Sequence, residues 1–251
     1  MRTLLAALSV CLLAAGKLSD LPARAPVALQ GETRHVQGIE VDSGTLWVSS
    51  VDTQRKRGLI FEFDAGSGSL RRSVEAQIGE RYHPGGISLD GNHLWVPVAE
   101  YRRSSSSSIQ RRNRKTLALE WEFRVEDHIG AIAVVPEGLV GANWDAREFY
   151  VWNKAGKTLR KASNASGVAI QDMKYRNGKL IAGGLRPDRS GVIVWLEWPS
   201  LKPMRSVEAG RTDRGVAFTH EGLAVDGRIL YLLPEDGPSR LFAFELPEGW
   251  E

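Results

Sequence analysis

Four histidines in this sequence are each followed, 16 or 17 residues later, by an acidic residue. The pairs are His35 and Asp52, His83 and Glu100, His128 and Asp145, and His220 and Asp236. Imidazole nitrogens and carboxylate oxygens are good ligands for zinc or iron and good groups for proton transfer. If these side chains converge on one point, they form an acid–base site or a site for a divalent metal cofactor.

The regular spacing favours a different interpretation, in which each histidine bonds the acid of its own unit. One further unit lacks both residues and has Ala169 and Arg186 in the corresponding places. A hydrogen bond inside each unit explains why the two residues are present or absent together, and a shared metal does not require this. We therefore expect structural pairs, with a metal or catalytic role as the alternative.

The elements that position these residues belong to a repeat. Each copy has an apolar segment, a turn rich in Asp, Asn and Gly, and a second apolar segment. The five copies begin at Ile39, Ile87, Ile132, Met173 and Leu223. Their spacing of 41 to 50 residues is that of propeller blades. Each copy predicts an antiparallel hairpin, and two further strands follow in most units.

The repeat predicts an all-β fold, a five-bladed β-propeller with four antiparallel strands in each blade. The last unit ends at Leu246 without a fourth strand, whereas residues 26–31 form a spare strand ahead of the first unit. We expect this N-terminal strand to complete the fifth blade and close the ring, which removes an unpaired sheet edge. A β-sandwich or an open run of hairpins is the alternative, but neither explains the repeated four-strand unit.

The blade pattern resembles WD40-type propeller repeats. In that family a histidine before the first strand bonds an aspartate in the turn after the second strand, and the third strand ends in Trp-Asp. This chain has the first feature in four units and a loose form of the second, as in Trp152-Asn153. The resemblance implies the fold and packing of the blades.

Further polar residues are expected on the same rim as the histidines, which we call the top rim. Gln37, Gln171 and Glu221 each precede a repeat anchor by two residues, and they suit a small polar ligand. Alternatively, the two glutamines cap backbone groups. Arg186 follows two glycines and suits a carboxylate or phosphate, and Trp144 offers a stacking face. We expect ligand binding on the side of the rim that carries Arg186.

A basic segment interrupts the second unit after its second strand. It contains five consecutive serines at 104–108, which have no apolar face to bury, so we expect a mobile loop. Its arginines offer a contact for an anionic surface. They are Arg102, Arg103, Arg111, Arg112 and Arg114. The alternative is an exposed strand kept soluble by its charge.

Residues 1–16 have the pattern of a secretory signal peptide and contain Cys11, the single cysteine. We expect residues 17–25 to be a linker and residues 26–251 to be one propeller domain. The sequence thus predicts an exported protein, secreted or periplasmic, that is monomeric and has no transmembrane segment. Its net charge of +3 does not favour nucleic acid as a partner.

Three classes of function fit these features. The preferred one is an exported protein that binds a small molecule, a glycan or a protein segment on the top rim. The second is an enzyme, either a metal-dependent hydrolase or lyase or a relative of exported plant-type glutaminyl cyclotransferases. The phrase 35–39, His-Val-Gln-Gly-Ile, resembles the first-blade phrase of those five-bladed propellers, whereas Gly85 and Gly86 stand where their second-blade phrase carries a glutamate. The third class is an interaction scaffold without a ligand site.

Overall fold

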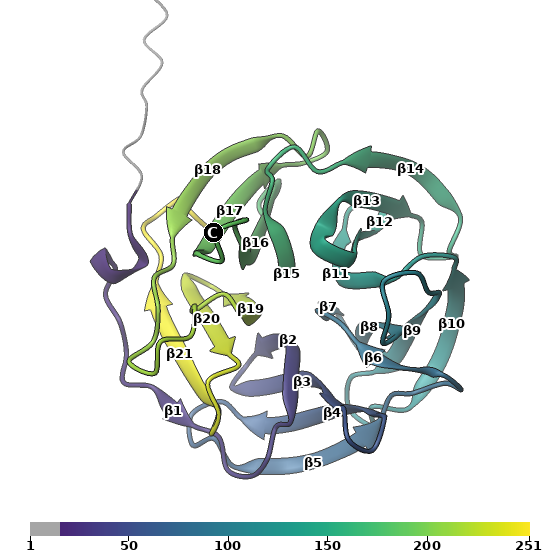
Figure 1. Ribbon diagram of the computed structural model, residues 1–251, viewed down its shortest axis with the longest axis horizontal. Coiled ribbons are helices and arrows are strands. Elements are labelled where there is room, and N and C mark those ends of the chain that lie inside the picture. Colours follow the sequence, from purple (N-terminus) through teal and green to yellow (C-terminus); the bar gives the residue numbers. More distant parts are fainter. Residues whose placement is uncertain (1–15) are drawn as a thin grey trace, which may run out of the picture.

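The computed structural model describes residues 16–251 and consists of five antiparallel sheets arranged around a centre (Figure 1). This confirms the predicted five-bladed β-propeller. Blade one contains β2 (His35–Asp42), β3 (Thr45–Asp52), β4 (Arg57–Asp64) and β5 (Leu70–Glu75). Blade two contains β6 (Arg81–Pro84), β7 (Ser88–Asp90), β8 (His93–Glu100), β9 (Ser107–Asn113) and β10 (Leu119–Val125).

The remaining blades repeat this order from the centre outward. Blade three contains β11 (Ile129–Val135), β12 (Gly138–Asn143), β13 (Glu148–Trp152) and β14 (Thr158–Ser163). Blade four contains β15 (Ala169–Arg176), β16 (Lys179–Leu185), β17 (Gly191–Glu197) and β18 (Pro203–Glu208). Blade five contains β19 (Glu221–Asp226), β20 (Ile229–Pro234), β21 (Arg240–Glu245) and β1 (Val27–Ala28). Two short 3-10 helices, η1 (Leu18–Asp20) and η2 (Trp144–Ala146), complete the described elements.

The hairpins form where the sequence places residues that accept a left-handed backbone. Asn177 and Gly178, between β15 and β16, have φ angles of 47° and 77°. Two consecutive positive φ angles match the right-handed twist of the flanking strands. The apolar residues then pack between adjacent blades, as where Trp95 and Ile109 of blade two meet Trp152 of blade three. The core is therefore a set of layers between the blades.

The N-terminal segment closes the ring, as predicted. Val27 of β1 lies opposite Leu241 of β21, and the backbone N–H of Leu29 donates to Ser239 O at 2.9 Å. Residues 17–25, expected as a linker, pack against blades four and five, and Leu18 is fully buried there. We call the place where blade five meets blade one, and where the ring closes, the seam. The proposed signal peptide lies outside the described residues except for Gly16. Within residues 16–251, no helix has the length and hydropathy needed to cross a membrane.

The centre of the ring is filled by one acidic side chain among small residues. The residue just before each repeat anchor is small in four blades, and in blade four it is Asp172. The small residues are Gly38, Gly86, Ala131 and Gly222. A Cβ atom on Gly38 would lie 2.4 Å from Gly86 Cα, so the innermost strands touch there. The space that remains is taken by the Asp172 carboxylate, which is fully buried.

Asp172 ties several blades together at this hub. One carboxylate oxygen accepts hydrogen bonds from the backbone N–H groups of Ile39 in blade one and Leu223 in blade five, at 2.9 and 3.1 Å. The other accepts from Lys174 Nζ at 2.6 Å, and Lys174 also donates to Ile87 O of blade two at 2.8 Å. Burial raises the pKa of Asp172 to about 6, against the lowering effect of Lys174. This pair was not predicted from the sequence, although Asp172 is the one acid among the small residues that precede the repeat anchors.

Candidate functional site

A pocket of about 250 Å³ lies on the top rim and receives side chains from all five blades. Its lining residues are His35, Gln37, His83, Tyr101, His128, Gly130, Asn143, Trp144, Asp145, Ile170, Gln171, Arg189 and Glu221. Several of them stand two residues before a repeat anchor and therefore lie next to the hub. Three of the four repeat histidines therefore converge on one pocket, which we call the central pocket.

The side of the central pocket formed by blades two and three is aromatic. His83 and His128 contact each other with 3.1 Å between Nδ1 and Nε2, and both are buried. The ring of Tyr101 lies 4.5 Å from that of His83, and the ring of Trp144 lies 4.5 Å from that of His128. We call these four residues the aromatic half.

The contacts of the aromatic half set the protons on its two histidines. His128 Nδ1 lies 2.9 Å from Arg102 O, and because a carbonyl oxygen only accepts, this nitrogen carries the proton. His128 Nε2 then accepts from His83 Nδ1, which leaves His83 Nε2 unprotonated. Burial, followed by the charges of His128 and His35, lowers the pKa of His83 well below 6.5. Burial also lowers the pKa of His128, although the contact with Arg102 O and the charge of Asp127 act against it.

The side formed by blades five and one is acidic. His35 Nδ1 lies 2.6 Å from Glu235 Oε1, and His220 Nε2 lies 3.0 Å from Glu221 Oε1. Burial lowers the pKa of His35, but the contact with Glu235 and the charges of Glu221 and Glu235 outweigh it, so the pKa is raised. The contact with Glu221 raises the pKa of His220 despite burial. His35 and Glu221 line the central pocket, and we call all four residues the acidic half.

The local fold brings three members of the acidic half together. Glu221, the first residue of β19, lies opposite Pro234, the last residue of β20. Beyond that pair, the backbone N–H of Glu235 donates to His220 O at 2.6 Å. The open end of one hairpin therefore places His220, Glu221 and Glu235 side by side. Glu235 was not a candidate from the sequence, because it stands one residue before the acid that the spacing selected.

The predicted hydrogen bonds within each blade do not form, so that prediction is wrong. Each of the four acids contacts an arginine instead. The pairs are Asp52 with Arg55, Glu100 with Arg102, Asp145 with Arg103, and Asp236 with Arg240. Asp52 and Glu100 end β3 and β8 next to arginines of the following turn, whereas Asp145 in η2 meets an arginine of blade two and Asp236 meets the first residue of β21. The histidines lie at or near the start of the innermost strands instead. The fold resembles WD40-type propellers, but the histidine-to-aspartate bond of that repeat is not formed.

Four of the five ligand candidates predicted on the rim line the central pocket, and one does not. Gln37, Trp144, Gln171 and Glu221 all line the central pocket, where the sequence placed them. Arg186 does not, because it lines a separate surface pocket with Asp188 and Arg211. The turn after β16 reverses the chain, with Arg189 N donating to Arg186 O at 2.9 Å and a φ of 66° at Arg189. Arg189 is therefore the blade-four cation that reaches the central pocket.

The basic segment of blade two is more ordered than its composition indicated. Ser107 and Ser108 belong to β9 and are buried, which contradicts the expected mobile loop. Arg112 is also buried and donates to Leu117 O at 2.8 Å, so it is not part of an anion-binding surface. The other arginines contact acids or tryptophans of the chain itself. These contacts are Arg102 with Glu100, Arg103 with Asp145 and Trp144, Arg111 with Trp121, and Arg114 with Asp42 and Trp47.

The two glycines of blade two leave no room for a side chain. A Cβ atom on Gly85 would lie 2.1 Å from Gly130 O, and one on Gly86 would lie 2.5 Å from Asp172 Oδ1. A glutamate at either position would push against the backbone of blade three or against the hub. The acid expected from the glutaminyl cyclotransferase pattern therefore has no equivalent here. The blade-two side chains that line the pocket are His83 and Tyr101.

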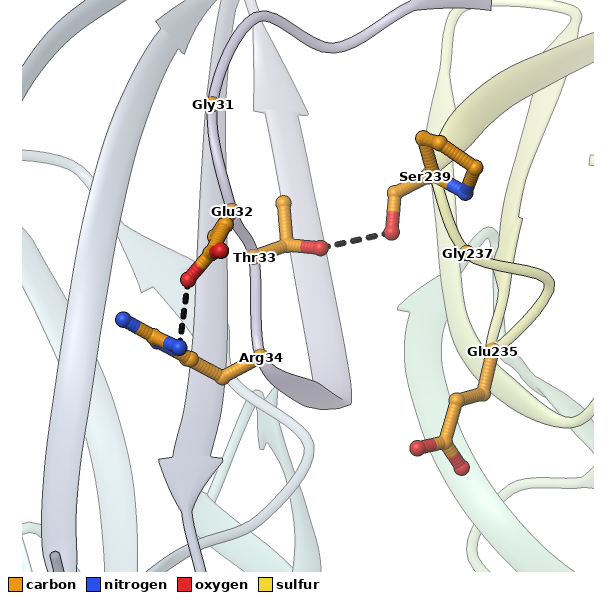
Figure 2. Close-up of a pocket in the computed structure, with 8 residues that line it drawn as sticks. Gly31, Glu32, Thr33, Arg34, Glu235, Gly237 and Ser239 are labelled. Carbon is orange, nitrogen blue, oxygen red and sulfur yellow. Dashed lines mark hydrogen bonds and ion pairs between the residues drawn. The ribbon is translucent and has the colours of Figure 1, made fainter.

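A second cavity, of about 470 Å³, opens at the seam (Figure 2). It is lined by residues 31–34 on one side and by Glu235 and residues 237–239 on the other. Thr33 Oγ1 and Ser239 Oγ bridge the two sides at 2.6 Å. In Figure 2 the Glu235 side chain extends away from this bridge and contacts none of the other residues drawn. Glu235, a member of the acidic half, thus also lines the seam cavity.

Comparisons with known proteins agree with this fold. The model of a family described as "Family of unknown function (DUF6454)" matches residues 21–178. No curated protein matches the sequence. The structure is similar to that of a glutaminyl cyclase from Myxococcus xanthus, with a TM-score of 0.68 and 12% identity over 90% of this chain and 97% of that one. A weaker likeness is to hydrazine synthase from Kuenenia stuttgartiensis, with a TM-score of 0.48 and 15% identity over 89% and 59% of the two chains. At 12% identity, the likeness to the glutaminyl cyclase shows the propeller fold alone.

Proposed function

We propose that this chain, which belongs to the family of unknown function DUF6454, binds a small polar molecule in the central pocket and acts on it by proton transfer. The observation that carries the proposal is that the pKa values of two histidines in one pocket are shifted in opposite directions. The pKa of His35 is raised beside Glu235, whereas that of His83 is lowered well below 6.5 by burial. Titratable groups whose environments push their pKa values apart are suited to the roles of acid and base. His35 is the proposed proton donor and His83 the proposed acceptor.

The rest of the pocket suits recognition of a small ligand. Its volume of about 250 Å³ is that of a ligand the size of an amino acid. Gln37 and Gln171 offer amide groups, Trp144 offers an aromatic face, and Arg189 supplies a positive charge for a carboxylate. These groups come from three different blades, so the ligand is held only by the assembled ring.

Ligand-observed NMR tests the binding step, with free amino acids, a glutaminyl dipeptide and monosaccharides as probes. We expect one of these classes to bind the parent chain and to lose affinity with Trp144→Ala or Arg189→Ala. Arg186→Ala is the matched control, since Arg186 lies on the same turn but outside the central pocket. Equal binding by the Arg189→Ala and Trp144→Ala variants and the parent would contradict the proposal.

Cyclisation of an N-terminal glutamine is the second candidate reaction. It is supported by Gln37, which lines the pocket with His35 in the phrase that resembles the glutaminyl cyclotransferases. The glycines at 85 and 86 require that His83 take the part of the missing acid. Ammonia release from the glutaminyl dipeptide measures this activity, and we expect His35→Asn or His83→Phe to lower it by about 10²- to 10⁴-fold. If the parent chain releases no ammonia, this second candidate is wrong.

Export of the chain is also a proposal, supported by the signal-like pattern of residues 1–16. Expression of the full chain in a bacterial host, followed by N-terminal sequencing of the product in the periplasmic fraction, tests it. We expect the mature protein to begin near residue 17. A cytoplasmic product that retains residues 1–16 would contradict export.

A further inference from the structure

We infer that His220, Glu221 and Glu235, in the acidic half, form a binding site for a divalent metal ion of the zinc type. One ligand atom from each residue lies within 4.8 Å of the others. An imidazole nitrogen with two carboxylate oxygens is a donor set that suits Zn²⁺. Three protein ligands also leave coordination positions open for water or for a ligand of the central pocket.

The charges around these residues provide a second, independent observation. Each acid of the four pairs predicted from the spacing forms an ion pair with an arginine, whereas these two glutamates do not. Among residues 16–251, Glu221 forms an ion pair only with His220, and Glu235 only with His35. The Glu221 side chain is 5% exposed, so water compensates little of its charge. Two carboxylates that share only histidines as partners form a site that attracts a cation.

The geometry at His35 supports the same conclusion. His35 Nδ1 lies 2.6 Å from Glu235 Oε1, yet this buried nitrogen has no directed hydrogen bond within the described residues. The close approach is therefore a contact off the donor direction, so it does not occupy the carboxylate with a directed hydrogen bond. In Figure 2 no interaction is marked between the Glu235 carboxylate and the other residues that line the seam cavity. We assign His35 as a positioning residue that holds Glu235 toward His220 and Glu221.

A histidine–glutamate contact elsewhere in the chain lacks the third ligand that the acidic half provides. His93 Nε2 lies 3.2 Å from Glu120 Oε2 on blade two, and both side chains are about one-third exposed. No third acid or histidine joins that pair within the described residues. It therefore provides a matched control, with the same two residue types but no site.

The role of the metal rests on the proposed function, because Glu221 also lines the central pocket. A bound divalent ion there polarises an oxygen of a ligand or lowers the pKa of a water molecule. Binding of the ion itself does not depend on that role, so the two can be tested separately.

Calorimetric titration of the purified full chain with Zn²⁺, after removal of any affinity tag and dialysis against a chelator, tests the site. We expect one ion per chain, with at least about tenfold weaker binding in Glu221→Gln, Glu235→Gln and His220→Asn. Glu120→Gln should bind like the parent. Co²⁺ added in place of Zn²⁺ should give visible absorption bands that the Glu221→Gln variant lacks. Failure of the parent to bind Zn²⁺, or equal binding by the parent and the ligand variants, would overturn the inference.

The same samples separate this inference from the proposed function. Stoichiometric Zn²⁺ that depends on Glu221, together with no binding of any small-molecule probe, sustains the metal site and contradicts the proposed function. Small-molecule binding that depends on Trp144, with Zn²⁺ binding unaffected by Glu221→Gln, sustains the proposed function and overturns the metal site. Melting temperatures of the variants within a few degrees of the parent show that a loss of Zn²⁺ binding is not a loss of folding.

Discussion

The aromatic and acidic halves of the central pocket use the same residue type at related blade positions but give it opposite charge behaviour. In the aromatic half, His83 and His128 meet each other and two rings, and burial lowers the pKa of both. In the acidic half, a glutamate contact raises the pKa of His35 and of His220. The blade position therefore determines where a histidine side chain points. Its neighbours, most of which belong to other blades or to loops, determine its charge.

The largest expected effect comes from opening the ring at the seam, on the side of the acidic half. Deleting residues 17–31 takes away β1 and the buried side chains of Leu18 and Leu29, whose burial stabilises the fold by about 3 to 6 kcal/mol. That is a large share of the roughly 5 to 15 kcal/mol of a folded domain, and the deletion also opens the seam beside Glu235. We expect loss of soluble monomer, measured by yield and size-exclusion chromatography. A monomer that melts at the parent temperature would contradict the role of β1 in closing the ring.

The next largest effect is expected from Asp172→Ala at the hub, which contacts blades on both sides of the central pocket. Asp172→Ala leaves Lys174 as an unpaired charge that is fully buried, which typically costs about 3 to 5 kcal/mol. It also removes the acceptor of the backbone N–H groups of Ile39 and Leu223. Urea unfolding measures the change in the free energy of unfolding. Asp213→Ala, at an exposed acid of blade five, is the control, and an Asp172→Ala effect no larger than that of the control would show that the hub does not join the blades.

The third prediction concerns the aromatic half and the pH dependence of the free energy of unfolding. The groups that face its histidines are His35, Asp127 and Arg103, besides the two imidazoles themselves. The pKa values of His83 and His128 are lowered in the folded chain, so below about pH 6.5 the unfolded chain binds more protons than the folded one. Their contribution to stability is complete above that pH and is lost as the pH falls through the folded-state pKa values.

The slope of this loss is at most about 1.4 kcal/mol per pH unit for each histidine. We expect the double variant His83→Phe, His128→Phe to flatten the fall in unfolding free energy between about pH 6.5 and 5, measured by urea titration at each pH. Parallel curves for the parent and the double variant would mean that these two histidines are not buried in the neutral form.

The smallest expected effect comes from Asp145, the acid that the spacing paired with His128. Asp145→Asn keeps a residue type that tolerates the φ of 59° at this position. Since Asp145 is 42% exposed and contacts Arg103, its ion pair contributes about 0 to 1 kcal/mol. We expect a shift in melting temperature of a few degrees at most. A loss of more than about 2 kcal/mol would revive the Asp145–His128 pair that the spacing predicted.

The sequence predicted the blades because their signals are local. A turn such as Asn177-Gly178 and the apolar segments beside it specify a hairpin without reference to the rest of the chain. The closing strand was also predictable, since a missing fourth strand at one end matched a spare strand at the other. The convergence of His35, His83 and His128 followed from their shared place before the innermost strands, and only the choice between pairing and convergence was open.

The partners of these residues depend on contacts between blades, which spacing does not contain. Glu235 approaches His35 across the seam, and His128 reaches His83 from the neighbouring blade. Arg189 replaces Arg186 because the turn after β16 folds back, a detail that depends on a left-handed backbone at one residue. The Asp172–Lys174 pair was accessible in principle, because a charged residue stood in a column of small ones.

The closure of the ring at the seam also sets the order in which the pocket is completed during synthesis. All four residues of the aromatic half lie between positions 83 and 144, so they have been synthesised once blades two and three have been made. The acidic half must wait for the last blade, because His35 belongs to the first strand of blade one and Glu235 to the turn before β21. An unfinished or prematurely terminated chain can therefore present the rings of the pocket but not its carboxylates. Any chemistry that needs both halves begins only when the whole chain has been made and its ends have met.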